Sequence, residues 1–364
     1  MKQVKDSLRK IDSHMEHRSH DGFAPLAAVS ATATPPVLDD ADLDLVAALQ
    51  VAPRAPLSAL AEVLGSSAST VGRRLTRLGE ERLLRVIGQV EWPMLSEGNP
   101  MHLWVATAPG QAWQVARQLS ELPEIPFVAT TMGRTDVYCS LHATRRTRAR
   151  ELLTTRIPSV PGVRSAHTEL VLRATTKSAS WRLRRLDDAQ VRALREVADP
   201  VVEPTAVTGF GEDELRAVEL LRQDGRASAA DVARGLGISR STAYRLTQSL
   251  LQRGLVRPRV EIEPALLGHP LEVVIELHAA PGAIQHVADA LARHPSARYV
   301  SIVAGTSSVI HHGVFRDEDG LAELLTRDLA HFPGITACEV SVVLDVLRRY
   351  WIGRADGRLL SGDR

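Results

Sequence analysis

The sequence of 364 residues predicts an α+β fold made of two tandem copies of one unit. Three observations lead to this prediction. Many residues recur at one fixed offset along the chain. Each copy opens with apolar residues at helical spacing, and it then changes to short segments rich in β-branched residues, which are typical of strands. The repeat is far longer than that of a solenoid, so each copy is expected to bury a core of its own.

The repeat reads without gaps when Leu43 is aligned with Leu215, an offset of 172 residues. Glycines, prolines and core leucines then stay in register. The matching pairs include Leu49 and Leu221, Arg54-Ala55 and Arg226-Ala227, Leu64-Gly65 and Leu236-Gly237, Pro109-Gly110 and Pro281-Gly282, Gly133 and Gly305, and Pro161-Gly162 and Pro333-Gly334. We interpret this register as duplicated structure.

The first part of each copy is predicted to be helical. In the second copy a short helix over 230–236 ends at Gly237. A second helix follows, which Ser239 can cap and Gly254 can close by adopting positive φ. A short helix, a glycine turn and a polar second helix form the helix-turn-helix pattern, whose second helix lies in the DNA major groove.

The first copy repeats this helical pattern with two departures. Gly72 lies inside its third helix, at a cost of up to about 1 kcal/mol against Ala. Arg82 stands where Gly254 closes the helix of the second copy. The expected elements are a helix capped by Asp39 or Asp40, helices over 58–64 and 67–81, and a wing-like strand or linker over 83–90, matched by 255–262 in the second copy.

The second part of each copy reads as strand, helix, strand, strand, helix, strand. This order is the ferredoxin-like βαββαβ arrangement. In the first copy the strands are expected over 101–108, 127–132, 135–141 and 163–172, with helices after Pro109-Gly110 and over 148–157. The matching first strand of the second copy is 271–279.

Composition limits the function classes. The net charge is +1, so any nucleic-acid binding must come from local clusters of cations. No apolar run is long enough to span a bilayer, and we expect no secretion signal because the N-terminal residues contain no continuous apolar segment. Cys139 and Cys338 are far apart, which favours a reducing cytoplasm. We expect no metal and no cofactor, because no His/Cys cluster has the spacing of ligands.

These patterns divide the chain into domains. The predicted ranges are a disordered segment over 1–37, a first helix-turn-helix domain over 38–92, a first βαββαβ domain over 100–175, a linker over 176–209, a second helix-turn-helix domain over 210–264, a second βαββαβ domain over 270–352 and a tail over 353–364. The linker is expected to be part helix, over 187–198, and part flexible.

The two predicted recognition helices carry the candidate contacts with double-stranded DNA. Arg can donate two hydrogen bonds to a guanine edge, and Ser and Thr often hold phosphates. The candidates are Ser67, Ser69, Thr70, Arg73, Arg74 and Arg77 in the first copy, and Ser239, Arg240, Ser241, Thr242, Tyr244 and Arg245 in the second. Because the helices differ, we predict a target with two related but unequal half-sites.

A helix-turn-helix followed by a βαββαβ domain resembles the Lrp/AsnC family of transcription regulators, also called leucine-responsive or feast/famine regulators. The matching motifs are D-G-R-A-S over 224–228, V-A-R-G-L-G-I-S over 232–239, G-R-T-D-V over 133–137, and the Pro-Gly pairs. The resemblance covers about residues 38–175 and 208–350. It looks like the fused, two-unit form found in actinobacteria, with winged helix-turn-helix and RAM-type domains.

The resemblance implies a DNA-binding regulator that is tuned by a small-molecule effector such as an amino acid. It also implies homo-oligomers that form through the sheets. Carried over from the family, the effector site lies at Gly133, Arg134, Thr135 and Asp136 in the first copy and at Gly305, Thr306, Ser307 and Ser308 in the second. An Asp can pair with a ligand ammonium and a Ser only weakly, so ligand chemistry is expected to differ between the copies.

Two other classes of function remain open. Fused pairs of this architecture also occur among sirohaem decarboxylases, and the segment 99–104 is similar to one of theirs, although the second copy shows no matching His/Arg/Tyr set. The third class is a ligand-binding or scaffolding module without a DNA site. Arg54 and Arg226 are interpreted as braces of the turn after the first helix rather than phosphate contacts.

Several residues are expected to be structural. We assign Trp104, Trp113 and Phe127 to the core, and Cys139 and Cys338 to buried apolar positions.

Overall fold

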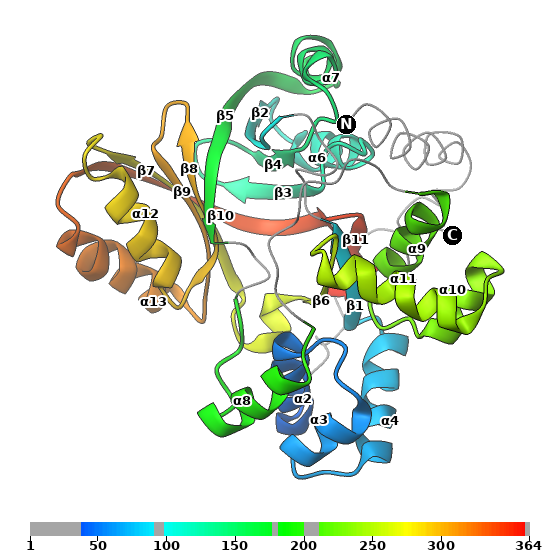
Figure 1. Cartoon of the computed structure of the whole chain (residues 1–364). Coiled ribbons are helices and arrows are strands. Elements are labelled where there is room, and N and C mark those ends of the chain that lie inside the picture. Colours follow the sequence, from blue (N-terminus) through cyan, green and yellow to red (C-terminus); the bar gives the residue numbers. More distant parts are fainter. Residues whose placement is uncertain (1–37, 91–97, 177–180, 200–210, 361–364) are drawn as a thin grey trace. The chain divides into compact units, whose positions relative to one another are not determined.

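The computed structural model describes residues 38–90, 98–176, 181–199 and 211–360. The chain folds into two compact units, and each unit takes one segment from each copy of the repeat. The first unit holds both helix-turn-helix parts, and the second holds both βαββαβ parts (Figure 1). Parts of the same kind are therefore grouped together.

The helical unit contains two copies of one three-helix arrangement. The first copy forms α2 (Asp40–Val51), α3 (Leu57–Val63), α4 (Ala68–Glu80) and the strand β1 (Leu84–Val90). The second copy forms α9 (Glu212–Gln223), α10 (Ala229–Leu236), α11 (Arg240–Gln252) and the strand β6 (Val256–Ile262). An additional helix, α8 (Asp188–Glu196), lies within the expected linker and contacts α2 and α3.

The helix ends follow the local signals in the sequence. The Asp39 carboxylate accepts a hydrogen bond from the Asp42 N–H, and the two residues form a capping box. Ser67 and Ser239 cap α4 and α11 by accepting from the N–H groups of Thr70 and Thr242. The predicted starts of these helices are confirmed.

Arg82 adopts the left-handed conformation that glycine favours. Its φ is 59°, and Gly254 at the same place in the second copy has φ of 66°. A side chain in this region costs about 1–2 kcal/mol. The repeat therefore tolerates strain in the first copy that the second copy avoids.

Arg82→Gly is expected to raise the free energy of unfolding by about 0.5–1 kcal/mol, because relief of strain exceeds the added entropy of the unfolded chain. Gly254→Ala is the matched reverse change and should lower it by about 1 kcal/mol or more. Urea unfolding of both variants checks this. Equal midpoints for Arg82→Gly and wild type would contradict the assigned strain.

Strands β1 and β6 join the two helix-turn-helix parts. They pair antiparallel, and the register runs from Leu84 opposite Ile262 to Val90 opposite Val256. The sequence predicted each as a wing-like strand or linker. In the structure each strand finds its partner in the other copy, because each presents an open edge to the other.

The second unit is a closed barrel of eight strands. The first copy supplies β2 (Met101–Thr107), β3 (Phe127–Met132), β4 (Val137–Leu141) and β5 (Val163–Thr176). The second copy supplies β7 (Leu271–Ala279), β8 (Ala297–Ala304), β9 (Val309–Phe315) and β10 (Ile335–Arg349). The order is β10-β3-β4-β2-β5-β8-β9-β7, and β7 pairs back to β10.

The two sheets are joined by equivalent pairings. Strand β5 pairs with β8, and β10 pairs with β3, with registers that include Leu170 opposite Ala304 and Val342 opposite Met132. Applying the offset of 172 residues to one junction gives the other. The barrel therefore has the symmetry of a dimer within a single chain.

Helices cover the outside of the barrel. They are α6 (Ala112–Ser120) and α7 (Arg146–Glu151) in the first copy, and α12 (Ile284–Arg293) and α13 (Glu318–Glu323) in the second. A π-helical turn continues each of α7 and α13, over Leu152–Arg156 and Leu324–Asp328. Short 3₁₀ turns span Pro264–Leu267 and Leu329–His331.

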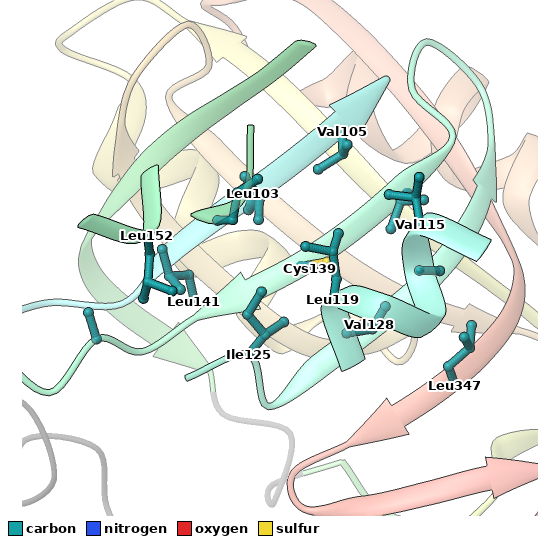
Figure 2. Packing of buried hydrophobic residues seen from close by; sticks show 14 residues of the cluster. Leu103, Val105, Val115, Leu119, Ile125, Val128, Cys139, Leu141, Leu152 and Leu347 are labelled. Atoms are coloured by element: carbon teal, nitrogen blue, oxygen red, sulfur yellow. The ribbon is translucent and has the colours of Figure 1, made fainter. Parts of the chain in front are cut away.

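Three apolar clusters fill this unit. One lies between the first sheet and its helices, where Val115 and Leu119 of α6 face Leu103, Cys139 and Val128 (Figure 2). The second cluster is its equivalent under α12 and α13. The third contains Trp104, Tyr138, Val171, Val274, Val303 and Ile310, and it combines residues of both copies.

Some expectations are wrong. Trp113 is 46% exposed, because it lies on the outer side of α6, whose inner side is Val115, Ala116 and Leu119. Cys338 is exposed on β10 rather than buried. The expected tail forms the short strands β11 (Ile352–Ala355) and β12 (Arg358–Leu359), since β11 finds a partner in the end of β10. The expected disordered segment 1–37 lies outside the described residues, as do residues 361–364 of the expected tail.

Candidate nucleic-acid interface and ligand turns

The helix α11 presents a polar, cationic face. Ser239, Arg240, Ser241 and Arg245 are exposed, and the Tyr244 side chain is 58% exposed. Ala243, Thr247, Leu250 and Leu251 form the buried side of the helix. A shallow hollow of about 380 Å³ runs along the open side and is lined by Tyr244, Arg245, Gln248, Ser249, Gln252 and Arg253.

Both recognition helices begin with the same set of hydroxyl groups. Ser239 Oγ lies 3.0 Å from Ser241 Oγ and 2.8 Å from Thr242 Oγ1. In the first copy the equivalent distances from Ser67 Oγ, to Ser69 Oγ and Thr70 Oγ1, are both 2.9 Å. Backbone N–H groups and hydroxyls at a helix N-terminus suit a phosphate oxygen.

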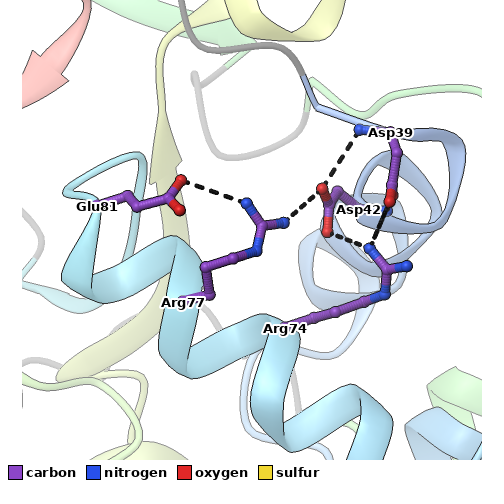
Figure 3. Close-up of polar contacts among 5 residues, drawn as sticks. All are labelled: Asp39, Asp42, Arg74, Arg77 and Glu81. Carbon is purple, nitrogen blue, oxygen red and sulfur yellow. Dashed lines mark hydrogen bonds and ion pairs between the residues drawn. The ribbon is translucent and has the colours of Figure 1, made fainter.

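Arg74 and Arg77 of α4 are held by carboxylates of the protein itself (Figure 3). Arg74 Nη1 lies 2.8 Å from Asp39 Oδ2 and 2.7 Å from Asp42 Oδ1. Arg77 Nη2 lies 2.6 Å from Asp42 Oδ2, and its Nη1 lies 3.2 Å from Glu81 Oε2. The hydrogen bond from Arg74 holds the pKa of Asp39 below its usual value. These two cations are therefore largely neutralised, whereas Arg73 is exposed.

The second copy uses a different cation for the equivalent bridge. Glu214, which corresponds to Asp42, lies 2.6 Å from Arg253 Nη1 at the end of α11. Leu246 and Ser249 occupy the positions of Arg74 and Arg77. The acidic position on the first helix is retained, and the basic partner has moved.

Arg54 and Arg226 link the two helix-turn-helix parts. Arg226 Nη1 donates to Pro53 O at 2.6 Å, and its Nη2 donates to Ala55 O at 2.9 Å. Reciprocally, Arg54 donates to Gly225 O and, at 3.3 Å, to Ala227 O. We call this pair the arginine clasp. The expectation that each arginine braces a turn is confirmed, but the turn belongs to the other copy.

The clasp is partly buried and its charges repel. Burial, and then the positive charge of Arg54, lower the pKa of Arg226. Gly225 approaches the strand β1 so closely that a Cβ on it would lie 2.6 Å from the Ile87 carbonyl carbon. These contacts fix the spacing of α4 and α11 within the unit.

The predicted ligand turns lie between equivalent strands of the barrel. We call residues 133–136, between β3 and β4, the first turn, and residues 305–308, between β8 and β9, the second turn. Asp136 Oδ2 accepts from Thr107 N at 2.7 Å and from Thr107 Oγ1 at 3.1 Å. Ser308 Oγ likewise accepts from Ala279 N at 3.2 Å. Asp136 thus has an internal partner, which competes with the predicted role toward a ligand ammonium.

A cluster of charged groups surrounds the first turn. Arg134 Nη1 lies 3.1 Å from Glu339 Oε2 on β10, and both side chains are well exposed. Glu276 and Glu169 also act electrostatically on Arg134. Glu276 is only 4% exposed, and burial, together with the charges of Glu169 and Glu339, raises its pKa to about 7.

Glu169 contacts the second turn. It is fully buried on β5, and its carboxylate accepts hydrogen bonds from Thr306 Oγ1 at 2.9 Å, Ser307 N at 2.8 Å and Ser307 Oγ at 2.6 Å. Sequence reasoning missed this residue. The available signal was a Glu at an inward strand position where the second copy has Ser341.

No group of three or more His, Cys, Asp or Glu in residues 38–90, 98–176, 181–199 and 211–360 is arranged to hold a metal ion. Within the same ranges no helix has the length and apolar character needed to cross a membrane.

Family models match most of the described chain. An AsnC-type helix-turn-helix domain matches residues 38–78, and an Lrp/AsnC ligand binding domain matches residues 272–350. A C-terminal dimeric alpha+beta barrel domain of AsnC type matches residues 112–183. The chain belongs to the Lrp/AsnC family. The second helix-turn-helix of this Lrp/AsnC protein matches an IclR helix-turn-helix domain over residues 215–259, so the two helix-turn-helix parts match different family models.

Curated relatives of this Lrp/AsnC protein are single-unit chains that match little more than a third of it. An uncharacterized HTH-type transcriptional regulator of Pyrococcus abyssi is 28% identical over 137 residues, covering 37% of this chain and 87% of the relative. The regulator LrpA of Pyrococcus horikoshii is 23% identical over 132 residues, covering 36% and 94%.

A solved structure shares the two-unit fold. The siroheme decarboxylase NirDL superposes with a TM-score of 0.56 over 85% of this chain and 93% of its own, at 12% identity. At that identity the likeness shows the fold alone.

Proposed function

We propose that this Lrp/AsnC protein is a sequence-specific DNA-binding regulator whose affinity for DNA is tuned by a small metabolite with a carboxylate, such as an amino acid. The observation that carries the proposal is the pair of exposed recognition helices, α4 and α11, joined by the arginine clasp and the β1–β6 pairing. Two recognition helices held at a fixed spacing suit two half-sites of one operator.

The proposed DNA contacts are fewer than the sequence suggested. In the second copy they are Ser239, Arg240, Ser241, Thr242, Tyr244 and Arg245. In the first they are Ser67, Ser69, Thr70 and Arg73. We assign Arg74 and Arg77 to the ion-pair cluster with Asp39 and Asp42, which leaves α4 with less positive charge for DNA. This difference supports unequal half-sites, with the stronger contact from α11.

A gel shift with DNA from upstream of the protein's own gene tests the proposal. The double change Arg240→Ala and Arg245→Ala is expected to weaken binding by about ten-fold or more. It should also reduce the slope of log affinity against log salt by about 2, because two cations that meet phosphates release about 0.9 counterion each.

The matched control removes two exposed cations from the barrel unit, Arg117→Ala and Arg164→Ala. It changes the net charge equally and should leave affinity and salt slope near those of wild type. If both double variants weakened binding to the same degree, α11 would not be the DNA reader.

For the effector site we propose the first turn, with Gly133, Arg134 and Thr135 as contacts and Asp136 as a brace of strand β2. The exposed Arg134 guanidinium suits a carboxylate, and the nearby Glu276 and Glu339 suit an ammonium group. A thermal-shift screen of amino acids, followed by gel shifts with those that bind, tests this part. No change of DNA affinity with any binder would refute the tuning.

Association of further copies is also a proposal. The symmetry-equivalent Leu172 and Leu344 are 52% and 59% exposed on β5 and β10. Exposed apolar side chains at equivalent positions support an assembly of several chains through these strands. Light scattering of wild type against Leu172→Lys with Leu344→Lys is expected to show a smaller assembly for the variant.

The alternative function is that of an enzyme similar to the sirohaem decarboxylases. It rests on the fold likeness to NirDL, and Trp104, Tyr138 and Phe127 pack together in the barrel, with ring centroids 4.5 Å apart for Trp104 and Tyr138 and 5.7 Å apart for Phe127 and Tyr138. Turnover of sirohaem by the purified chain would establish it.

A further inference from the structure

The second turn already holds a carboxylate, that of Glu169. Both oxygens are engaged: Oε1 accepts from Thr306 Oγ1 and Ser307 N, and Oε2 accepts from Ser307 Oγ, at 2.6–2.9 Å. The side chain also lies against Gly305, where an added Cβ would be 2.6 Å from Glu169 Cγ. A buried carboxylate needs such charge-assisted hydrogen bonds.

The first turn has the same parts without a carboxylate. The repeat places Thr135 where Ser307 stands and Ser341 where Glu169 stands. Thr135 is 7% exposed, and among the described residues its Oγ1 has no hydrogen-bond partner. Gly133 lies against Ser341 as Gly305 lies against Glu169, with an added Cβ 3.0 Å from Ser341 Oγ.

The two turns share two features and differ in the side chain that the neighbouring strand presents to them. Each turn has a glycine that lets the neighbouring strand approach and a buried hydroxyl two residues later. The strand beside the second turn presents a long acidic side chain, and the strand beside the first turn presents a short hydroxyl. A buried hydroxyl without a partner is costly, so a bound group that supplies a partner for Thr135 Oγ1 would stabilise the folded protein.

We propose that the two turns are versions of one carboxylate-binding site, that Glu169 permanently occupies the second as an internal ligand, and that only the first is open to the carboxylate of a free molecule. The identity of that free molecule rests on the effector function proposed above. The assignment of Glu169 as the internal ligand of the second turn rests on the geometry alone. An α-amino acid fits the first turn, since Arg134 and Thr135 face its carboxylate, and Glu276 and Glu339 supply charge for its ammonium group.

Chemical rescue tests the resident carboxylate without knowledge of the effector. Glu169→Ala removes the equivalent of acetate and leaves three donors in a cavity beside the second turn. The variant should unfold at a lower temperature than wild type. Sodium acetate should restore much of the loss, whereas sodium chloride at equal ionic strength should not. Wild type, whose second turn is already occupied, should gain less from acetate than Glu169→Ala does, and any gain it shows comes from the first turn.

Two further variants keep the test decisive. Glu169→Gln preserves the shape and removes the charge, so it should be destabilised yet insensitive to acetate. If Glu169→Ala does not fold, Glu169→Ser installs the residue of the other copy and takes its place in the rescue. Acetate that acts on wild type and variant alike would overturn the proposal.

The reverse substitution tests whether the first turn binds a carboxylate. Ser341→Glu places a carboxylate beside Thr135 in the position that Glu169 has beside Ser307. It should raise the unfolding temperature and abolish the thermal shift caused by amino acids, and Ser341→Gln should do neither. Rescue by acetate together with no amino-acid response in wild type would refute the effector function and leave the internal ligand standing. If acetate fails to rescue the variant while wild type still responds to amino acids, the internal ligand is refuted and the effector function stands.

Discussion

Replacing Arg54 and Arg226 together with alanine is expected to lower the free energy of unfolding by about 3–5 kcal/mol and to reduce the affinity for an operator with two half-sites to that for a single half-site. The clasp supplies donors to four backbone carbonyls, those of residues 53, 55, 225 and 227. Ala55 is fully buried and Ala227 is 5% exposed. A buried carbonyl that loses its donor costs about 1–3 kcal/mol, and part of this is offset because two partly buried charges that repel are removed.

Lysine is expected not to substitute for arginine in the clasp. Each guanidinium bridges two carbonyls on either side of the opposite arginine, and an ammonium group has no planar fork to do this. Arg54→Lys with Arg226→Lys should therefore resemble the alanine variant in urea unfolding and in gel shifts. DNA that carries a single half-site should still bind weakly, because each helix-turn-helix keeps its own core.

Arg216→Ala is the matched control for the clasp. Arg216 Nη2 donates to Gly235 O at 3.0 Å, but both residues belong to the second helix-turn-helix. Its loss should cost under about 1 kcal/mol and leave operator binding unchanged. If the clasp variant had a free energy of unfolding no lower than that of Arg216→Ala, the β1–β6 pairing alone would hold the two helix-turn-helix parts together.

Glu276→Gln is expected to stabilise the protein at neutral and alkaline pH and to change the pH dependence of its stability. Burial first, and then the charges of Glu169 and Glu339, raise the pKa of Glu276 from 4.5 to about 7, against a lowering effect of Arg134. The folded state therefore binds more protons than the unfolded state between these pH values. Stability falls as pH rises through this window, and the full loss, about 3 kcal/mol, is present above about pH 7.

Urea unfolding at a series of pH values measures this effect as the difference between Glu276→Gln and wild type. The advantage of the variant should be small near pH 4.5 and should grow to its full size above about pH 7. Glu323→Gln, on the exposed helix α13, is the control and should show no such growth. A constant difference across the window would mean that the pKa of Glu276 is the same in the folded and the unfolded protein.

The candidate sites were partly predictable. The hydroxyls at the starts of α4 and α11 lie where the capping signals placed them, because a cap depends on residues within one turn of the helix. The roles of Arg74 and Arg77 were not predictable from the exposed face of a helix, since their partners Asp39 and Asp42 lie on another helix. Glu169 was missed for the same reason, because its partners are more than 130 residues away.

The sequence by itself determined the duplication, the order of helices and strands within each copy, and the capped starts of α4 and α11. These depend on periodicity, on caps and on glycines with positive φ, all of which act between neighbours along the chain. Only the tertiary structure decided that parts of the same kind from the two copies are grouped. It paired β1 with β6, closed the two sheets into one barrel, and placed each clasp arginine on the turn of the other copy. Open strand edges and unpaired carbonyls take whichever complementary partner the fold brings near, and two copies of one sequence complement each other by symmetry.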